Sequence, residues 1–307
     1  MDQRILARLR CPVCGEPLAE TAAGTARALR CPRRHSFDIA RQGYVNLLAG
    51  RAPHTGDSAE MVAARADFLA AGHYATVAAA LADTARRIVY GAARVVEGAE
   101  DARPAANPAG SDGADEAYPL VVDAGAGTGW YLAAVLAALP DAVGLALDVA
   151  KPALRRAARA HPRAAAALAD TWQRLPLADR SATVLLNVFA PRNGAEFHRV
   201  LDPAGALLVV TPTADHLAEL VDALNLLRVD PEKADRVAGS LSAHFAEESA
   251  TEHRARLELS RGEVATLVGM GPSAWHADPA RLAERIAALP EPVPVTLAVR
   301  LGVHRPR

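Results

Sequence analysis

Three cysteines and one histidine near the N-terminus constrain the fold of this chain more than any other feature. They form the pattern Cys11-Pro-Val-Cys14 and Cys31-Pro-Arg-Arg-His35, and the 307-residue chain contains no other cysteine. Two pairs of thiolate or imidazole ligands, each pair on a tight turn, suit tetrahedral zinc. Because the protein supplies all four ligands, no position is left for water, and the zinc would be structural, with one ion per chain. We therefore expect a small zinc-ribbon module at residues 1–40, followed by something larger.

Positive charge is concentrated around this module. Residues 1–51 hold nine arginines and four acidic residues, although the whole chain has a net charge of −1. A local basic face is typical of a protein that binds the phosphates of a nucleic acid, and an ordinary solvated surface is the alternative. The candidate phosphate contacts are Arg27, Arg30, Arg33 and Arg34.

The remaining bulk features concern the membrane and the compartment. No window holds 18 uncharged apolar residues, so we expect no membrane-spanning helix. The first residues lack the apolar run of a signal peptide. Cysteines that act as thiolate ligands indicate a reducing compartment, and we expect a cytoplasmic protein.

The chain changes character three more times after the module. Residues 41–97 are predicted to be a connector followed by Ala-rich helices at 61–68 and 74–96. Residues 98–117 carry five acids and one arginine with no apolar period, which predicts a flexible acidic insertion. From residue 118 to 307, short apolar runs alternate with helical segments, which predicts βαβ units and a mostly parallel sheet in an α/β fold.

A glycine-rich loop follows the first of these predicted strands. It has the sequence Asp123-Ala-Gly125-Ala-Gly127-Thr128-Gly129, and acids end the next two strands at Asp148 and Asp170. Glycines let a ligand approach the backbone, and an acid after the second strand can bind both ribose hydroxyls. A nicotinamide dinucleotide site or a purely structural loop fits the same pattern. We favour S-adenosylmethionine because Asp123 suits its ammonium group better than a pyrophosphate, and Asp170 could meet the adenine amino group.

A polar and aromatic segment ends the fourth predicted strand. Asn187, Phe189 and Pro191 lie where an open α/β sheet binds ligands, beyond the carboxyl ends of its strands. An amide, an aromatic ring and a proline could hold a planar base beside the transferred methyl group, so these three residues are our candidate catalytic residues. An ordinary strand end with Phe189 in the core is the alternative.

The sequence resembles a known family, the 23S rRNA (guanine-N1)-methyltransferases. The resemblance covers nearly the whole chain except the acidic insertion, and it is most specific over His35–Leu48. Segments 187–193, 217–223 and 270–276 are most similar to the actinobacterial branch of the family, which includes the tylosin-resistance enzyme. The segments that carry the resemblance are 35–48, 56–61, 72–74, the glycine loop, 187–193, 211–223 and 270–276.

The resemblance implies a class I S-adenosylmethionine-dependent methyltransferase, with a Rossmann-like, mostly parallel seven-stranded sheet and a zinc-binding RNA-recognition module. It implies that Tyr74, Thr128, Gly129 and His216 contact the cofactor; the sequence pattern alone would make Tyr74 and His216 ordinary polar residues at helix starts. It also implies a homodimer with a cleft for a 23S rRNA hairpin. The implied target is guanine 748 in a domain II hairpin loop, with guanine 745 as the alternative, and macrolide (tylosin-type) resistance is an expected consequence.

Two other functions fit parts of the sequence. One is a small-molecule methyltransferase whose zinc ribbon serves only dimerisation, and the basic bias of residues 1–51 argues against it. The other is a degenerate fold that binds RNA without chemistry, and the intact loop Asp123–Gly129 with Asp148 argues against that.

Overall fold

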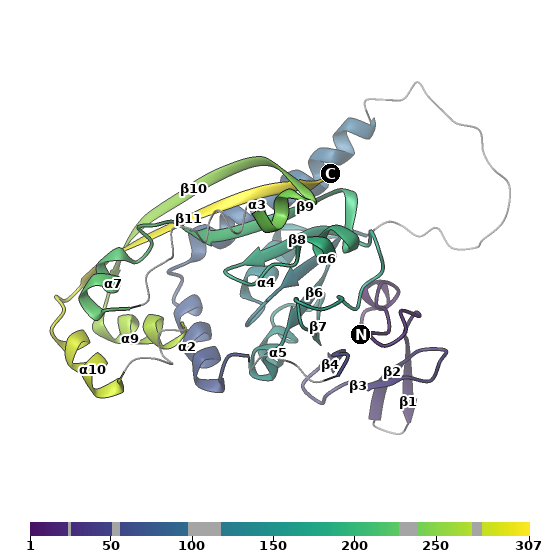
Figure 1. Cartoon of the computed structure of the whole chain (residues 1–307), viewed down its shortest axis with the longest axis horizontal. Coiled ribbons are helices and arrows are strands. Elements are labelled where there is room, and N and C mark those ends of the chain that lie inside the picture. Colours follow the sequence, from purple (N-terminus) through teal and green to yellow (C-terminus); the bar gives the residue numbers. More distant parts are fainter. Residues whose placement is uncertain (24–25, 51–55, 98–117, 227–238, 272–277) are drawn as a thin grey trace.

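An eight-stranded β-sheet organises the larger part of the molecule (Figure 1). The structure is a computed structural model that describes residues 1–23, 26–50, 56–97, 118–226, 239–271 and 278–307. The predicted acidic insertion at 98–117 lies outside the described residues. In sheet order the strands are β10 (Phe245–Leu259), β11 (Val293–Pro306), β9 (Leu201–Pro212), β8 (Ala182–Val188), β5 (Leu120–Ala124), β6 (Val143–Asp148), β7 (Ala164–Leu168) and β4 (Tyr44–Asn46).

This strand order confirms the predicted α/β fold with a mostly parallel sheet. The strands from β4 to β9 pair in parallel, and β11 pairs antiparallel with both β9 and β10. The chain enters the centre at β5, builds outward through β6 and β7, and then returns to the other side through β8 and β9. Ligand crevices form at such a reversal of strand order, beyond the carboxyl ends of the strands.

The sheet has one strand more than the seven predicted. Tyr44–Asn46, within the segment expected to be a connector, pairs in parallel with residues 166–168 of β7. Val45 is fully buried there. The two predicted helices that follow correspond to α2 (Ala59–Ala70) and α3 (Ala75–Glu97).

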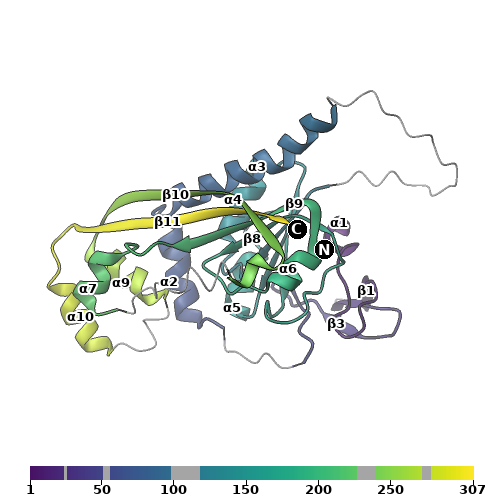
Figure 2. The ribbon, with the colours of Figure 1, turned by 45° about the horizontal axis from the view of Figure 1, so that its top comes forward.

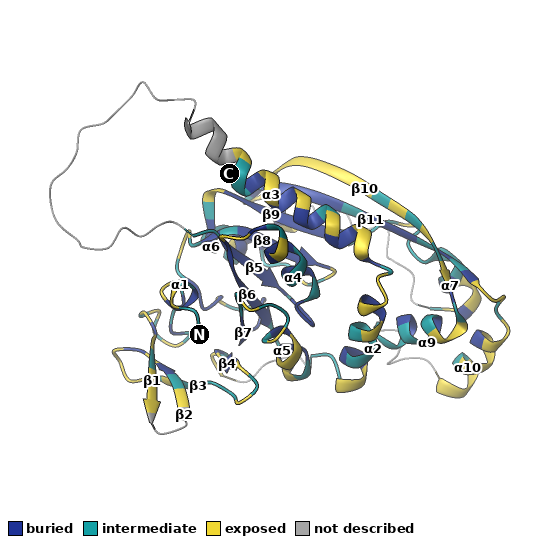
Figure 3. Cartoon of the chain, turned by 180° about the vertical axis from the view of Figure 1, so that it is seen from behind, coloured by how far each residue is buried: buried dark blue, intermediate teal, exposed yellow. Residues whose placement is uncertain are grey.

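Apolar side chains cover both faces of the sheet, and Figure 3 shows its central strands as buried. On one face, Leu81 of α3 and Leu132 of α4 (Trp130–Ala138) join the core; α5 (Lys151–Ala157) contributes to the same side. On the other face, Ile5 of α1 (Gln3–Leu6) and Phe197 of α6 (Gly194–Val200) pack with Leu145 of β6. Because both faces are buried, the central strands consist of nearly continuous apolar runs.

The N-terminal module packs against the second of these faces. Its strands β1 (Ala19–Ala23), β2 (Ala26–Arg30) and β3 (Ser36–Asp38) form a separate antiparallel sheet. The Arg8 guanidinium donates to the carbonyls of Ser181 (2.8 Å) and Tyr118 (3.0 Å), which ties the module to the larger sheet. Figures 1 and 2 place the module at one end of the molecule, with the C-terminal helices at the opposite end.

The C-terminal third combines long strands with short helices. Residues 293–304 alternate like an antiparallel strand, and β11 pairs antiparallel with β9 and β10 over this span. The span 230–271, which the sequence pattern leaves unassigned, contains β10 and α9 (Arg261–Gly269) in its described part. Helix α7 (Ala218–Leu224) follows β9, and α10 (Pro279–Ala287) precedes β11. Within the described residues, no helix is both long and apolar enough to cross a bilayer.

Candidate functional site

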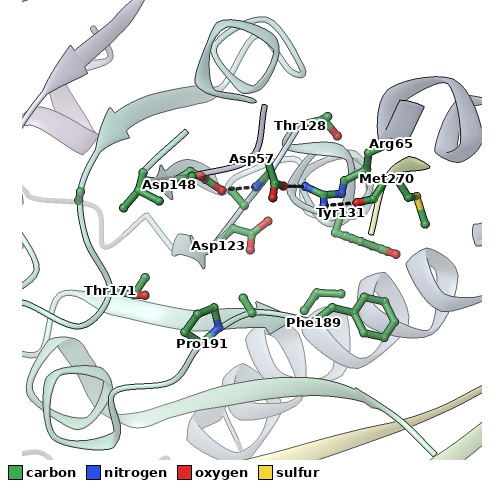
Figure 4. A pocket seen from close by; sticks show the side chains of 18 of the residues that line it. Asp57, Arg65, Asp123, Thr128, Tyr131, Asp148, Thr171, Phe189, Pro191 and Met270 are labelled. Atoms are coloured by element: carbon green, nitrogen blue, oxygen red, sulfur yellow. Dashed lines mark hydrogen bonds and ion pairs between the residues drawn. The ribbon is translucent and has the colours of Figure 1, made fainter. Parts of the chain in front are cut away.

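A cavity of 410 Å³ lies beyond the carboxyl ends of β5, β6, β7 and β8 (Figure 4). Its volume falls within the range of about 300–1,000 Å³ typical of small-molecule sites. The predicted cofactor-binding residues that line it are Tyr74, Asp123, Gly125, Gly127, Thr128, Asp148 and Asp170. The predicted residues that do not line it are Gly129, Asn187 and His216. The cavity therefore forms where the acids and the glycine loop were expected to meet.

The glycine loop between β5 and α4 needs its glycines for backbone shape and for space. Gly125, Gly127 and Gly129 all have positive φ, at 83°, 54° and 77°. A Cβ on Gly125 would lie 2.4 Å from the Cβ of Ala190, so the loop and the strand end at β8 touch without room for a side chain. Gly129 begins α4, where a Cβ would lie 2.9 Å from the Cα of Ala157. Gly129 therefore serves helix packing, while Gly125 and Gly127 face the cavity.

Asp123 is a buried acid without a partner. Its side chain is 1% exposed, and neither carboxylate oxygen has a hydrogen-bond partner in the described structure. Burial, with a smaller contribution from the nearby Asp148, raises the pKa of Asp123 from 3.8 to about 8. A carboxyl group in this state is suited to a cationic ligand, whose charge would favour the ionised form.

Asp148, at the end of β6, braces the glycine loop in this structure. Its two oxygens accept hydrogen bonds from the backbone N–H groups of Gly127 and Ala150, both at 2.8 Å. Burial raises the pKa of Asp148, and the two backbone donors oppose that shift. Asp170 is similarly held by its own turn, because it accepts from the Trp172 backbone N–H at 2.9 Å and from the Gln173 side chain at 3.3 Å.

Tyr74 and His216 are joined by a hydrogen bond at the cavity wall. Nδ1 of His216 accepts from the Ala298 backbone N–H at 3.2 Å, and Nε2 lies 3.3 Å from the Tyr74 hydroxyl. Burial lowers the pKa of His216 to about 4, so the ring is neutral at pH 7. A neutral ring whose Nδ1 accepts must carry its proton on Nε2 and donate it to Tyr74. His216 therefore lies behind Tyr74 and sets the direction of the tyrosine hydroxyl.

Phe189 and Pro191 line the cavity, whereas Asn187 supports it from behind. Phe189 has a φ of 52°, is 41% exposed, and its ring stacks on the His216 ring with centroids 6.0 Å apart. Phe189 is therefore not the core residue of the alternative interpretation. Asn187 is fully buried, and its amide donates to the carbonyls of Ala124 (3.2 Å) and Pro191 (2.8 Å). The amide nitrogen of Asn187 therefore fixes the loop, while its buried Oδ1 has no hydrogen-bond partner in the described structure.

Several lining residues were missed by the sequence interpretation. The first group surrounds the guanidinium of Arg65 on α2, which forms an ion pair with Asp57, just before that helix, and donates to the Met270 carbonyl at 2.9 Å (Figure 4). The second consists of Tyr131 of α4 and Trp172, which is 56% exposed at the cavity edge. Asp57 lies in a segment on which the family resemblance depends, which was the one signal in the sequence that could have pointed to it.

The four predicted zinc ligands lie together. One ligand atom from each of Cys11, Cys14, Cys31 and His35 falls within 4.8 Å of the others. His35 Nδ1 is 3.5 Å from Cys11 Sγ and 3.4 Å from Cys31 Sγ, and Cys14 Sγ is 3.7 Å from Cys31 Sγ. Such separations match a tetrahedron with Zn–S and Zn–N bonds of about 2.3 and 2.1 Å. The three thiols and one imidazole therefore fit a structural zinc ion.

The four candidate RNA-binding arginines are all exposed on the N-terminal module. Arg27 forms an ion pair with Glu20 at 2.5 Å, and Arg33 lies 3.8 Å from Glu16. Exposed pairs of this kind contribute about 0–1 kcal/mol, so they leave the arginines able to exchange partners.

Comparison with known proteins adds an independent finding. Residues 9–52 match the zinc-ribbon family described as "RlmA, N-terminal". A Micromonospora griseorubida protein assigned as a 23S rRNA (guanine-N1)-methyltransferase is 66% identical over 307 residues, which span both chains completely. The Streptomyces fradiae 23S rRNA (guanine(748)-N1)-methyltransferase is 49% identical over 306 residues, covering 100% of this chain and 99% of its own. Among solved structures, a Bacillus halodurans protein described as a methyltransferase aligns with 62% of this chain and 93% of its own, at 17% identity and a TM-score of 0.42.

Proposed function

Because the chain belongs to the 23S rRNA (guanine-N1)-methyltransferase family, we propose that it methylates N1 of guanine 748 in a domain II hairpin loop of 23S rRNA. The methyl donor is S-adenosylmethionine. The observation that carries the proposal is the presence in one chain of the acid-lined cavity and the zinc-ligand cluster, over a sequence that matches the guanine(748) enzyme from end to end. Resistance to tylosin-type macrolides and a homodimeric cleft for the hairpin belong to the same proposal and rest on family membership.

The cavity residues fit the chemical groups of S-adenosylmethionine, which supplies an electrophilic methyl group on a sulfonium. Asp123 would bind the ammonium group, because a buried carboxylate without a partner needs a cation. Asp148 would bind the ribose hydroxyls and Asp170 would face the adenine. Gly125 and Gly127 would allow close approach of the cofactor to the backbone.

The aromatic side of the cavity suits the target base. Phe189 and Pro191 present flat apolar surfaces at the carboxyl end of β8, against which an unstacked base can lie. Burial raises the pKa of Tyr74, so its hydroxyl keeps the proton at neutral pH. Since His216 donates to the Tyr74 oxygen, the tyrosine proton is free to be donated to a group in the cavity.

The N-terminal module would bind the hairpin through its arginines. Arg27 and Arg30 are exposed on β2, and Arg33 and Arg34 are exposed in the turn between β2 and β3 of the same small antiparallel sheet. Contacts of arginine with phosphates position an RNA without reading its sequence. Selection of the guanine would then depend on the RNA loop that reaches the cavity. Extruding a base costs least from such an unpaired loop.

The test is methyl transfer from tritium-labelled S-adenosylmethionine to a transcript of the domain II hairpin. A matched transcript with adenine in place of guanine 748 is the control, and we expect incorporation only in the first. Charge reversal at Arg33 and Arg34 should abolish transfer while cofactor affinity stays unchanged. Equal incorporation into both transcripts would contradict the proposed target, and loss of cofactor binding in the charge-reversal variant would contradict the proposed role of the arginines.

A further inference from the structure

Arg65 is the cationic side chain among the described residues that line the cavity. Four carboxyl groups share the wall with it, those of Asp57, Asp123, Asp148 and Asp170. S-adenosylmethionine carries two cationic groups, the sulfonium and the ammonium, and one anionic group, the carboxylate. The acids can account for the cationic groups. A ligand carboxylate in the same cavity would be repelled by those acids unless it lay at the guanidinium.

The guanidinium is held in place by two segments that are far apart in sequence. One terminal nitrogen pairs with Asp57, just before α2, and the other donates at 2.9 Å to the carbonyl of Met270, at the end of α9. The Arg65 side chain is 26% exposed. A Cβ on Gly127 would lie 3.5 Å from the Arg65 nitrogen that pairs with Asp57, so the guanidinium lies against the glycine loop.

Arg65 still has hydrogen-bonding capacity in this position. A guanidinium has five N–H donors in a planar fork, and two of them are used by Asp57 and Met270. The fork geometry matches a carboxylate, and an arginine that is already oriented loses less conformational entropy when it binds. Figure 4 shows Arg65 on the same side of the cavity as Thr128 and Tyr131.

We propose that Arg65, oriented by Asp57 and the Met270 carbonyl, binds the carboxylate of the methionine moiety of S-adenosylmethionine. This inference rests on the proposed function, since it assumes that the cavity binds that cofactor. It assigns the two ends of the amino-acid moiety to different residues, the ammonium to Asp123 and the carboxylate to Arg65. The competing explanation is that Arg65 only ties α2 to α9.

The test compares two ligands that differ only in the carboxylate. S-adenosylmethionine and decarboxylated S-adenosylmethionine are titrated into the wild-type protein, Arg65→Ala and Arg65→Lys by calorimetry. Arg86→Ala is the matched control, because Arg86 forms an exposed pair with Asp83 on α3, away from the cavity. Circular dichroism and thermal unfolding show whether each variant is folded.

We expect Arg65→Ala to bind S-adenosylmethionine about 10- to 100-fold more weakly, the effect of losing charge-assisted hydrogen bonds. The decarboxylated ligand should bind Arg65→Ala as tightly as wild type or more tightly, because Asp57 then lacks its cation. Arg65→Lys, which keeps the charge but not the fork, should lose less affinity for S-adenosylmethionine and none for the decarboxylated ligand.

Two results would overturn the inference and leave the proposed function intact. Equal losses for both ligands would show that Arg65 acts through the structure of the cavity, and an unchanged affinity for S-adenosylmethionine would show that it does not contact the carboxylate. Wild-type protein that binds neither ligand would contradict the proposed function itself, and the inference with it. Because the readout is ligand affinity, the experiment distinguishes a failure of the Arg65 inference from a failure of the proposed function without an RNA substrate.

Discussion

The buried Asp123 should make the ligand-free protein less stable as the pH rises, and Asp123→Asn should remove this dependence. The pKa of Asp123 is about 8 in the folded protein and 3.8 as its ordinary value. Between these two values the folded carboxyl holds a proton that the unfolded carboxyl has lost. The folded state therefore binds more protons, and its stability falls with rising pH across that window.

The size of the effect follows from the same two values. Each pH unit over which only the unfolded carboxyl is ionised costs about 1.4 kcal/mol of stability. From pH 5 to pH 8, where the folded carboxyl begins to ionise, the loss reaches about 3–4 kcal/mol. This is a large share of the total stability of about 5–15 kcal/mol that is usual for a folded protein. The isosteric amide of Asp123→Asn does not titrate and escapes the loss.

The assay is urea-induced unfolding of the ligand-free wild-type protein and Asp123→Asn at pH 5 and pH 8. The difference in free energy of unfolding between the two proteins should shift by about 3–4 kcal/mol in favour of the variant from pH 5 to pH 8. The variant should also bind S-adenosylmethionine more weakly. Asp83→Asn, at an exposed position on α3, is the control and should show no such shift. A difference between wild type and Asp123→Asn that is the same at both pH values would refute the reasoning.

Four further outcomes follow from the structure. Tyr74→Phe should lower methyl transfer to the hairpin transcript about 10-fold, because one donor to the cavity is lost; transfer at the wild-type rate would contradict this. His216 should stay neutral with its proton on Nε2 from pH 5 to pH 8, since its pKa is about 4; nitrogen NMR would reveal a protonated ring if this is wrong. Gly125→Ala should lower the free energy of unfolding more than Gly72→Ala, since both have positive φ but only Gly125 meets a neighbour, at 2.4 Å; equal losses in urea unfolding would exclude that clash. Cys14→Ser should reduce the zinc content from one ion per chain and abolish hairpin binding; elemental analysis with unchanged zinc would count against the ligand assignment.

The sequence predicted the central sheet well because its strands are buried on both faces. Segments such as Leu120–Ala124 and Val143–Asp148 are short apolar runs bounded by polar turns, and they became β5 and β6. The two edge strands of the sheet were harder to predict from the sequence. Strand β4 is three residues long and forms only by pairing with a segment more than 100 residues away. Strand β10 is exposed over most of its length, with Phe245 and Leu259 buried at its ends, so it lacks a clear apolar pattern.

The same distinction separates the predicted and the missed parts of the site. Asp123, Asp148 and Asp170 end adjacent parallel strands, and topology alone brings such residues to one edge of a sheet. Arg65 and Met270 reach the cavity only because α2 packs beside α9, a long-range contact that periodicity does not specify. For Tyr74 and His216 the family resemblance predicted contacts with the cofactor. The structure adds a hydrogen bond between them, with Tyr74 lining the cavity and His216 behind it.

The most direct test of the central claim is primer extension on 23S rRNA that lacks this modification, after incubation with the protein and S-adenosylmethionine. Methylation at N1 blocks Watson–Crick pairing, so the account predicts a new reverse-transcription stop at guanine 748 in the domain II hairpin loop. A stop at guanine 745 would move the target within the same loop. Methyl incorporation without any stop, or cofactor binding without incorporation into RNA, would contradict the account.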